Sequence, residues 1–519
     1  MKKHLLFTLV AIVLLTTSCN DDEFFELNNP PEFPWLNMDE LERGVVAPYN
    51  IALSSSWGNF MGNDRLLFDC MSDAVYLLPN TSADIPFEEM YFRLVDVETS
   101  RTNSGFRDGY KCITHANAVL DFLEETSYEP YGKPSETDRQ NLDRIQGEMQ
   151  FMRAFAYFHL AMRHAPMVGA SNFGNENILP LRLTTPRSAV QANEAEYVST
   201  DRIFEQIVRD LEVAVEKLPL SYESGIHHPS YGFGRANRYV AAALLGRVHF
   251  YLGNYDEAEQ QLDFVISGPF NLSELPIEAF NKDMAAQGSE VIWSSSNYDR
   301  NVVTTNKTLT SMNYSDYRAE NGGRGDFHKR CTWNQFPMSH TSLQAIGWMD
   351  DNLEETEAAR ADLRYQQLFW RLEGNNGELT ADPTIYETQY VHIKEPMVWG
   401  DKYYRGTEGE FTNVPLIRLP EMLLTRAILR FNKGDQAGAL NDLNQVREHA
   451  GLEPLTEITA EAIHQERLKE MAFEGDRLFY LKALQLPIPS GMRDVPAISH
   501  PYEGLYWTLP QAELDFKGG

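Results

Sequence analysis

The chain has 519 residues, of which 75 are acidic and 45 are basic, so its formal net charge is −30 at pH 7. A surface this acidic gains no counterion release on a polyanion, which argues against nucleic acid as a partner and against broad adhesion to anionic lipid. A chain of this length buries a large core without covalent cross-links. Apart from Cys19 it has three cysteines, Cys70, Cys112 and Cys331, an odd number with the spacing of neither a metal site nor a disulfide framework.

The first residues have the pattern of a secretory signal peptide. Lys2 and Lys3 form a basic start, and an apolar run of 13 residues follows over 5–17. A run of this length is too short to span a bilayer as a mature helix, so it is typical of the apolar part of a signal. We therefore expect residues 1–18 to be a cleaved signal peptide.

The signal ends at a cysteine that predicts lipidation. The sequence LTTSC over residues 15–19 is similar to the lipobox of bacterial lipoproteins, in which cleavage leaves an acylated N-terminal cysteine. The acidic run over residues 20–23 resembles the surface-export signal of Bacteroidetes lipoproteins, although a solvated tether would have the same composition. We expect Cys19 to be lipidated, residues 19–40 to form a tether, and the protein to be a surface-exposed lipoprotein held in outer-membrane lipid. The alternative is an ordinary signal peptide with a chance cysteine.

Helical periodicity dominates the rest of the chain. Apolar residues recur at steps of three or four between Phe204 and Leu218, which places them on one helix face, and Pro219 predicts the end of that helix. Similar stripes run over residues 106–123, 149–162, 235–251 and 416–431. The same spacing predicts three core phenylalanines, Phe151, Phe155 and Phe158.

Two helix pairs repeat one layout. A glycine, Gly253 or Gly434, breaks the first helix of each pair, and the next residue, Asn254 or Asp435, is placed to cap the second helix. Apolar residues then follow at the same offsets of five, nine and twelve from the glycine: Ala258, Leu262 and Val265, and Ala439, Leu443 and Val446. This is the pattern of tetratricopeptide hairpins, which cannot bury one face alone and therefore stack on their neighbours.

Residues 269–413 have a different character. Residues 290–293 predict a buried strand, and a long segment without helical period follows, rich in Asn, Asp, Arg, Gly and aromatic residues. Long irregular segments are usually functional or disordered, and the aromatic content argues against disorder. A sugar ligand is bound by flat aromatic rings, which contact its C–H groups, and by planar polar side chains, which hydrogen-bond its hydroxyls. The candidate ligand-binding residues are Tyr298, Tyr314, Tyr317, Arg318 and Trp333, with Trp57 as a further candidate.

Several motifs occur in order along nearly the whole chain. They are FRDGY and ANAVL within 106–120, EMQFMRAFAYF over 148–158, I-x-x-D-L-x-x-A-x-x-x-L over 207–218, IRLPEMLL over 417–424, NQVR over 444–447, ER-x-x-E with FEGDR within 466–477, and LPQAEL over 509–514. Together they resemble the SusD/RagB family of nutrient-binding lipoproteins. Phe106 stands where the family usually has Trp, and Tyr480 replaces its usual Asp in the final helix.

The resemblance implies a mainly α fold of tetratricopeptide-like hairpins, with a large irregular loop-rich insertion that carries a few short strands. It implies a single domain over 41–519, with hairpins near 235–268 and 416–450 and cargo-binding loops near 269–413. Its expected function is to capture glycans at the cell surface and deliver them to a SusC-like TonB-dependent outer-membrane transporter. Family position adds two weaker candidate binding residues, Asp73 and Asn103.

The sequence holds no H-E-x-x-H, G-x-S-x-G, phosphate-loop or C-x-x-C motif, so we expect a binding protein rather than an enzyme, with no cofactor and no metal site. The pair His227-His228 has no further ligands at helical spacing, so a loop surface is the better interpretation. Three alternatives stay open: a RagB-like peptide-binding protein, a non-catalytic scaffold that binds only protein, and a surface glycosidase. The acidic charge argues against sulfated or uronic cargo unless a local basic patch forms from Arg300, Arg318 and Arg324.

Overall fold

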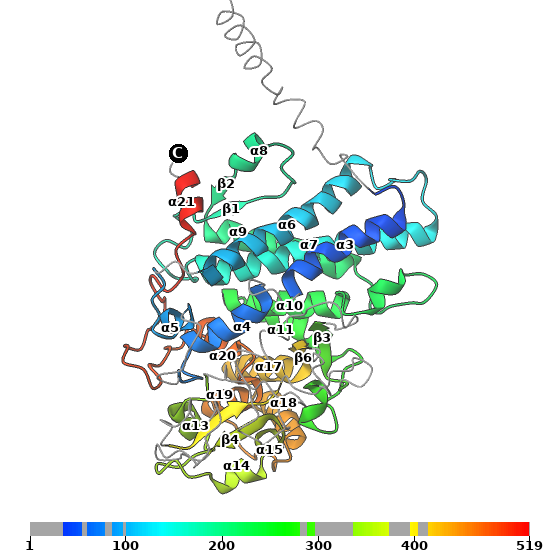
Figure 1. Cartoon of the computed structure of the whole chain (residues 1–519). Helices are drawn as coiled ribbons and strands as arrows, with labels where there is room; N and C mark the ends of the chain where they lie inside the picture. Colours follow the sequence, from blue (N-terminus) through cyan, green and yellow to red (C-terminus); the bar gives the residue numbers. More distant parts are fainter. Residues whose placement is uncertain are drawn as a thin grey trace, which may run out of the picture.

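The computed structural model describes residues 35–53, 60–77, 86–96, 100–280, 288–295, 336–372, 395–402 and 414–517. Helices dominate these ranges. In Figure 1 the upper layer holds α3 (Met38–Leu53), α6 (Ser100–Glu125), α7 (Glu136–His164) and α9 (Thr200–Lys217). Beneath it lie α10 (Arg238–Leu252) and α11 (Tyr255–Ile266), and lower still α17 (Leu419–Lys433), α18 (Gln436–His449), α19 (Ala460–Met471), α13 (His340–Ala345), α14 (Glu357–Ala361) and α15 (Leu363–Leu368).

The remaining helices are short or lie at the edges of these layers. α4 (Phe60–Met71) packs against α5 (Pro86–Tyr91) and α20 (Asp476–Ala483). The others are α8 (Ala189–Asn193), α21 (Gln511–Lys517), η1 (Pro229–Gly232) and η2 (Pro276–Phe280). Cys70 and Cys112 are buried free thiols.

α7 is the central helix of the upper layer, packed between α6 and α9. It begins at a capping box, in which the Ser135 side chain accepts from the Asp138 N–H and the Asp138 carboxylate accepts from the Ser135 N–H. The three phenylalanines at helical spacing are buried, so the prediction that they form core is confirmed. The helix predicted before Pro219 ends at Lys217, as expected.

Both predicted hairpins are present, as α10–α11 and α17–α18. Gly253 and Gly434 end the first helices with φ of +79° and +88°, a left-handed conformation that glycine adopts without steric penalty. Asp435 caps α18 as predicted, because its side chain accepts from the Gly438 N–H. The prediction for Asn254 is wrong in part: the residue occupies the cap position of α11, but its side chain makes no cap hydrogen bond.

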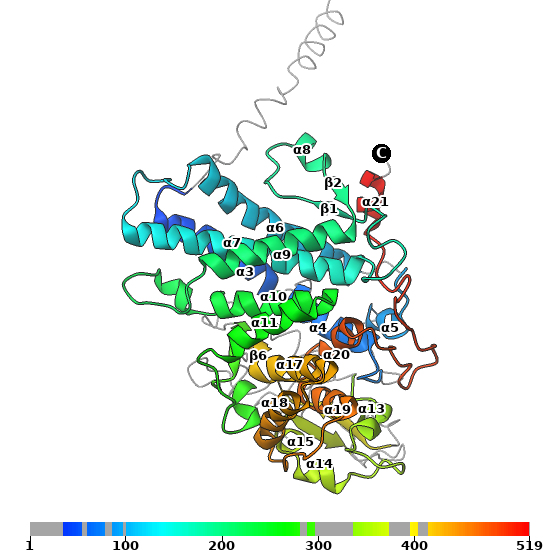
Figure 2. The same ribbon diagram turned by 180° about the vertical axis from the view of Figure 1, so that it is seen from behind.

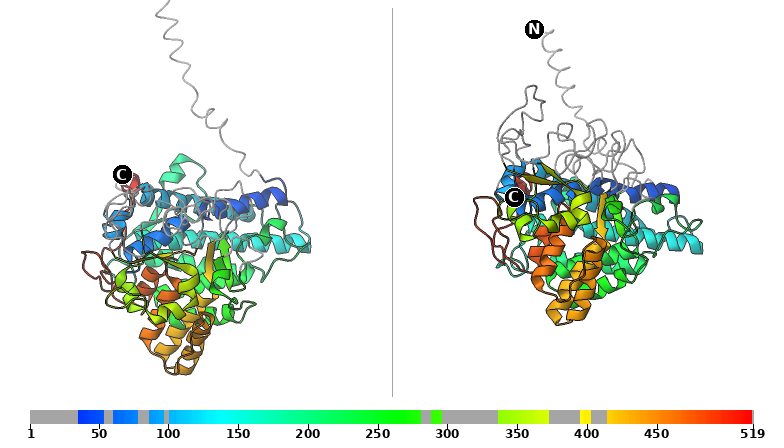
Figure 3. Two further views of the ribbon diagram at one scale, coloured as in Figure 1. Left: turned by 60° about the horizontal axis from the view of Figure 1, so that its bottom comes forward. Right: turned by 90° about the horizontal axis from the view of Figure 1, so that it is seen from below.

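The two hairpins stack on each other through α11 and α17. Charged pairs line this contact: Arg426 lies 2.7 Å from Asp263, and Lys433 lies 2.6 Å from Glu259. In both views of Figure 3 the orange α17–α18 hairpin lies on the opposite side of the molecule from the blue α3. The mainly α fold with tetratricopeptide-like hairpins is therefore confirmed.

Three two-stranded antiparallel sheets complete the described ranges. The pairs are β1 (Leu179–Leu181) with β2 (Glu196–Val198), β3 (Val291–Ser295) with β6 (Val414–Arg418), and β4 (Phe369–Leu372) with β5 (Met397–Gly400). β3 is the buried strand predicted after residue 290. β3 ends just before residues 296–335, and β6 begins just after residues 403–413. Both of these segments belong to the predicted cargo-binding region near 269–413.

Candidate ligand-binding face

Most residues predicted to bind ligand lie outside the described ranges. These are Trp57, Tyr298, Tyr314, Tyr317, Arg318 and Trp333, together with the lipidation site Cys19 and the arginines Arg300 and Arg324. Their roles therefore stay predictions. Two of the predicted residues, Asp73 and Asn103, are described.

Asp73 follows α4 and is almost fully buried, with 7% of its surface exposed. Its carboxylate accepts two hydrogen bonds from Arg477, from Nε at 2.8 Å and from Nη2 at 3.0 Å. Its backbone carbonyl accepts from the hydroxyls of Ser339 and Ser342. Asp73 therefore joins α4 to α20 and α13, and any ligand would meet a carboxylate that already has a partner. Asn103 is half-buried in the first turn of α6 and stays a prediction.

A short ladder of backbone hydrogen bonds lies beside Asp73, formed by residues 74–76, 337–339 and 398. The Tyr76 N–H donates to the carbonyl of Pro337 at 2.8 Å, and the Met338 N–H donates to the carbonyl of Val398 at 2.7 Å. The Val75–Met338 ladder thus joins three segments that are far apart in sequence. The ladder lies next to residue 336, where the described chain resumes within the predicted cargo-binding region near 269–413.

Aromatic and polar side chains gather at this ladder. The half-buried Tyr76 makes an edge-to-face contact with Tyr91 at 6.5 Å between ring centroids, and Tyr91 contacts Phe92 at 5.2 Å. The His340 ring lies 3.6 Å from the Glu395 carboxylate. Burial, with a smaller effect of Glu395, raises the pKa of Tyr76. Of these rings, Tyr76 and Phe92 are half-buried, whereas Tyr91 and His340 are buried. Half-buried aromatic rings next to a carboxylate have the chemistry that a sugar ligand needs.

Sequence reasoning missed Tyr76 and Phe92. The nearby Asp73 gave a weak signal, but single aromatic residues next to a helix are as typical of core as of a binding face. We name the group Tyr76, Tyr91, Phe92, His340 and Glu395 the candidate ligand-binding face.

Two buried arginines, Arg493 and Arg93, support the candidate ligand-binding face by hydrogen bonds to backbone carbonyls. Arg493 donates to the carbonyls of Cys70 at 2.6 Å and Tyr91 at 2.8 Å, and its guanidinium lies 4.1 Å from the Tyr91 ring centroid. Arg93 donates to the carbonyls of Met71 at 2.9 Å and Pro489 at 2.5 Å. Burial lowers the pKa of Arg93 to about 10. The arginines tie the end of α4 to the C-terminal part of the chain.

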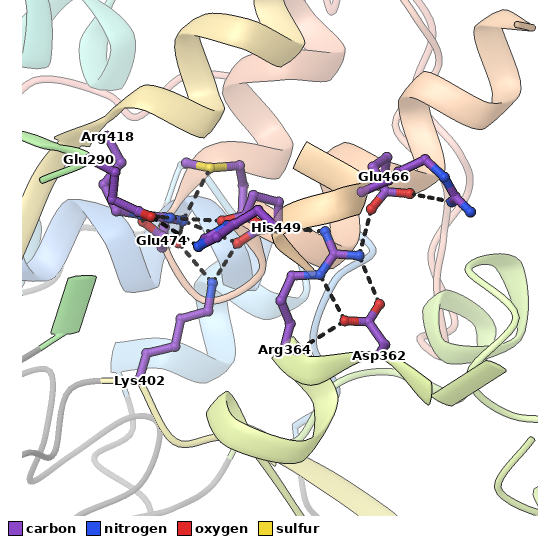
Figure 4. A network of polar contacts seen from close by, with 11 residues as sticks. Glu290, Asp362, Arg364, Lys402, Arg418, His449, Glu466 and Glu474 are labelled. Atoms are coloured by element: carbon purple, nitrogen blue, oxygen red, sulfur yellow. Dashed lines mark hydrogen bonds and ion pairs between the residues drawn. The ribbon is translucent and has the colours of Figure 1, made fainter. Parts of the chain in front are cut away.

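A buried charge cluster fixes the other ends of the predicted loops (Figure 4). Arg418, the last residue of β6, lies 2.8 Å from Glu290, 2.7 Å from Glu470 and 2.6 Å from Glu474. Lys402 adds an ion pair to Glu474 at 2.7 Å and donates to the Glu470 carbonyl. Burial favours the neutral form of Glu474, but Arg418 and Lys402 outweigh it and hold the pKa at about 2.

The cluster continues toward α15. Arg364 lies 2.7 Å from Asp362, 2.5 Å from Glu466 and 3.3 Å from Glu470, so Glu470 belongs to both halves. Arg447 reaches Glu466 at 3.0 Å. His449 lies 3.3 Å from Glu290.

The cluster is a frame rather than a contact surface, because all its members except the half-buried Arg447 are buried. Glu290 precedes β3, Lys402 is the last described residue before 403–413, and Arg364 lies in the helix that leads into β4. One set of ion pairs therefore fixes the stems of several predicted loops relative to one another. Sequence reasoning missed it because the partners are distant in the chain: Glu290 and Arg418 are 128 residues apart.

The interpretation of His227-His228 as loop surface is correct in part. His228 is half-buried and accepts from the Ser230 N–H at the start of η1. His227 is instead buried, and its ring accepts from the Glu223 N–H at 2.9 Å, so for His227 the interpretation is wrong.

Within the described residues no group of three or more His, Cys, Asp or Glu is arranged to hold a metal ion. No helix in those ranges is both long and apolar enough to cross a membrane.

Comparison with known proteins identifies the family. A model of the SusD family matches residues 289–482, and a second model, described as starch-binding associating with outer membrane, matches residues 71–252. The chain belongs to the SusD/RagB family. A comparison with curated proteins finds no match.

Solved SusD-like structures share the fold. A SusD superfamily protein from Bacteroides thetaiotaomicron has a TM-score of 0.69 at 19% identity, covering 92% of this chain and 98% of that one. A SusD-like carbohydrate-binding protein from Bacteroides fragilis has a TM-score of 0.69 at 17% identity, covering 93% and 98%. A laminarin-binding SusD-like protein has a TM-score of 0.65 at 20% identity, with the same coverage. At these identities the likeness shows the SusD-like fold.

Proposed function

We propose that this SusD-like protein is a surface-exposed lipoprotein that captures glycan oligosaccharides and delivers them to a SusC-like TonB-dependent outer-membrane transporter. The observation that carries the proposal is the match to family models over residues 71–252 and 289–482. A relative of the same fold is described as laminarin-binding, which favours a glycan as cargo. The second family model is described as associating with the outer membrane, which supports the location.

The chemistry of the described residues is compatible with capture without reaction. The candidate ligand-binding face offers partly exposed rings beside Glu395, and the buried charge cluster gives the neighbouring loop stems a rigid base. A few stacking and polar contacts imply a dissociation constant of about millimolar to micromolar, or roughly −4 to −8 kcal/mol. Weak binding suits a protein that must release its cargo, and we infer that the protein is not an enzyme.

The proposed organisation follows the sequence. A signal peptide over 1–18 is removed, Cys19 is acylated, residues 19–40 form the tether, and residues 41–519 form one SusD-like domain. α3 begins at Met38, so the last residues of the tether are already helical. The lipid anchor keeps the protein near the transporter, so a high effective concentration replaces strong intrinsic affinity between the two.

Isothermal titration tests the cargo. The protein is titrated with β-glucan, starch and mannan oligosaccharides and, separately, with a peptide digest. We expect heat with at least one glycan. We expect that heat to be lost in at least one of Tyr298→Ala, Tyr314→Ala, Tyr317→Ala and Trp333→Ala, but not in the control Tyr222→Ala, which changes an exposed tyrosine remote from the face. Heat with peptides alone would replace glycans by peptides as the cargo, and new reducing ends after incubation would show a glycosidase.

Copurification tests the partner. The lipidated chain is extracted from outer membranes with mild detergent, and we expect a TonB-dependent barrel protein to elute with it at a fixed ratio. Copurification of the barrel with no glycan binding in the titration would favour the protein-binding scaffold.

A further inference from the structure

One end of the upper helical layer lies next to the first described residues of the chain. The α6–α7 connection and the α9–α10 connection extend on the same side as the start of α3 in Figure 1, and Figure 2 shows the same arrangement from behind. We name residues 35–39, 126–141 and 217–233 the N-terminal end. The Tyr131 hydroxyl donates to the Asn37 carbonyl at 2.9 Å, and Asn141 donates to the Ile226 carbonyl at 2.7 Å, so the three segments touch.

The N-terminal end is rigidly supported. The Trp35 ring packs edge-to-face on Phe122 at 5.4 Å, and the Phe122 ring contacts Tyr131 at 6.3 Å. Behind it, the buried Arg235 pairs with Glu42 of α3 at 2.8 Å and with Glu148 of α7 at 2.7 Å. Side chains on this end therefore project from a fixed base.

This end concentrates exposed apolar side chains. Half of the large hydrophobic residues that lie exposed in the described ranges belong to it. They are Leu36, 78% exposed, and five residues that are 38–46% exposed: Tyr128, Tyr131, Leu220, Tyr222 and Phe233. Tyrosine and other amphipathic rings favour the boundary between lipid headgroups and acyl chains, where the ring is apolar and the hydroxyl stays hydrated.

The proposed lipid anchor holds this same end near the bilayer. Cys19 precedes Trp35, the first described residue, by about 16 positions, and a chain of that length spans at most roughly 58 Å in any conformation. Because Trp35 belongs to the N-terminal end, the tether enters the fold there and keeps that end within roughly 58 Å of the bilayer.

We infer that the N-terminal end is a lipid-contact surface, which rests on the outer leaflet and orients the protein there. This inference rests on the lipidation in the proposed function. Because the chain carries a formal net charge of −30, the contact depends on uncharged rings and on the anchor rather than on attraction to anionic headgroups. The anchor supplies the affinity and the apolar end supplies the orientation.

The orientation has a consequence for the candidate ligand-binding face. α5 and α13, which carry or adjoin that face, lie on the opposite side of the molecule from the N-terminal end in both Figure 1 and Figure 2. An N-terminal end resting on lipid would direct the face away from the attachment point.

Energy transfer on vesicles tests the inference. The lipidated full chain with Cys331→Ser carries a donor fluorophore at Lys133→Cys, on the N-terminal end, or at Glu357→Cys, on α14. It is reconstituted on vesicles of phosphatidylethanolamine and phosphatidylglycerol with an acceptor on the headgroups. We expect strong transfer from position 133 and weak transfer from position 357. Replacing Leu36, Tyr222 and Phe233 together by Ser should remove about half of the transfer from position 133, because the orienting contact is lost.

The matched control replaces exposed apolar residues elsewhere, Leu94→Ser, Leu275→Ser and Leu514→Ser, and should leave transfer unchanged. Equal transfer from positions 133 and 357, or no effect of the three serines at the N-terminal end, would overturn the inference and assign this surface to a protein partner. Failure of the chain to stay on the vesicles at all would instead refute the lipidation, which separates the two hypotheses.

Discussion

Arg418 and Glu474 form a buried ion pair, 2.6 Å long, that joins β6 to the turn between α19 and α20. Glu290 and Glu470 also contact the same guanidinium. The pair is central to the buried charge cluster, since it connects the end of β6 to the C-terminal helices. Its burial makes it sensitive to the loss of either partner.

Replacing Arg418 by Met should lower the free energy of unfolding by about 3–5 kcal/mol, because three carboxylates would lose their shared cation in a buried site. Urea unfolding followed by circular dichroism measures the change. The control is Arg202→Met, which removes the exposed pair with Glu205 and should change stability by less than about 0.5 kcal/mol. Similar midpoints for both variants would contradict the role of the cluster.

Stability should fall in acid through Glu474. Its folded pKa of about 2 lies below the ordinary glutamate pKa of 4.5, so its contribution is complete above pH 4.5 and is lost as the pH falls toward 2. Thermal unfolding between pH 7 and pH 2 measures this dependence. Glu474→Gln should be less stable at pH 7 and should lose less stability over the acid range than the unchanged chain. Parallel curves for the two proteins would show that Glu474 does not titrate in this way.

Lys482 should destabilise the fold at neutral pH. It is buried, its amine lies 3.5 Å from the Leu505 carbonyl, and burial lowers its pKa to about 8. Because the folded pKa is below the unfolded value of 10.5, the unfolded chain binds more protons between pH 8 and pH 10.5, and stability rises with pH across that window. We expect Lys482→Met to raise stability at pH 7 by about 1–3 kcal/mol and to flatten this rise, as measured by urea unfolding at pH 7 and pH 10. A destabilised Lys482→Met protein would count against this prediction.

Gly253 is required by the turn of the first hairpin. Its φ of +79° is unfavourable for an alanine, although a Cβ there would meet no atom within 4 Å, so the cost is conformational. Gly253→Ala should destabilise the protein by about 1–2 kcal/mol, measured as the shift in urea midpoint. Gly174→Ala is the control, since Gly174 has no positive φ and its nearest atom lies 3.4 Å away. An equal effect of both alanines would mean that the left-handed turn is not the cause.

Tyr76 should contribute to ligand binding. Tyr76→Ala removes a half-buried ring from the candidate ligand-binding face, and we expect the glycan dissociation constant to rise about tenfold. Titration with the best oligosaccharide measures this change, and unfolding midpoints confirm that the variant is folded. Tyr222→Ala, at the N-terminal end, should bind as the unchanged chain does. Unaltered affinity in Tyr76→Ala would move the site away from the described face.

The periodic parts of the structure could be predicted from the sequence. Helical spacing is a local property, so the stripe before Pro219, the core phenylalanines of α7 and the glycine-centred hairpins all follow from residues a few positions apart. The ordered motifs also indicated the SusD/RagB family. Asn254 shows the limit of local reasoning, because its cap position was predicted correctly but its side chain does not cap α11.

Only the tertiary structure decided which distant residues meet. Nothing near Glu290 in the sequence indicates a partner 128 residues away, and nothing near Tyr76 indicates that Pro337 lies beside it. Long-range pairs of this kind depend on how the layers pack. A buried charge or backbone N–H without a partner costs free energy, and the packing of the helices decides which partner lies within reach. The sequence by itself thus determined the helices and the family. The buried charge cluster and the candidate ligand-binding face form only when those helices pack together.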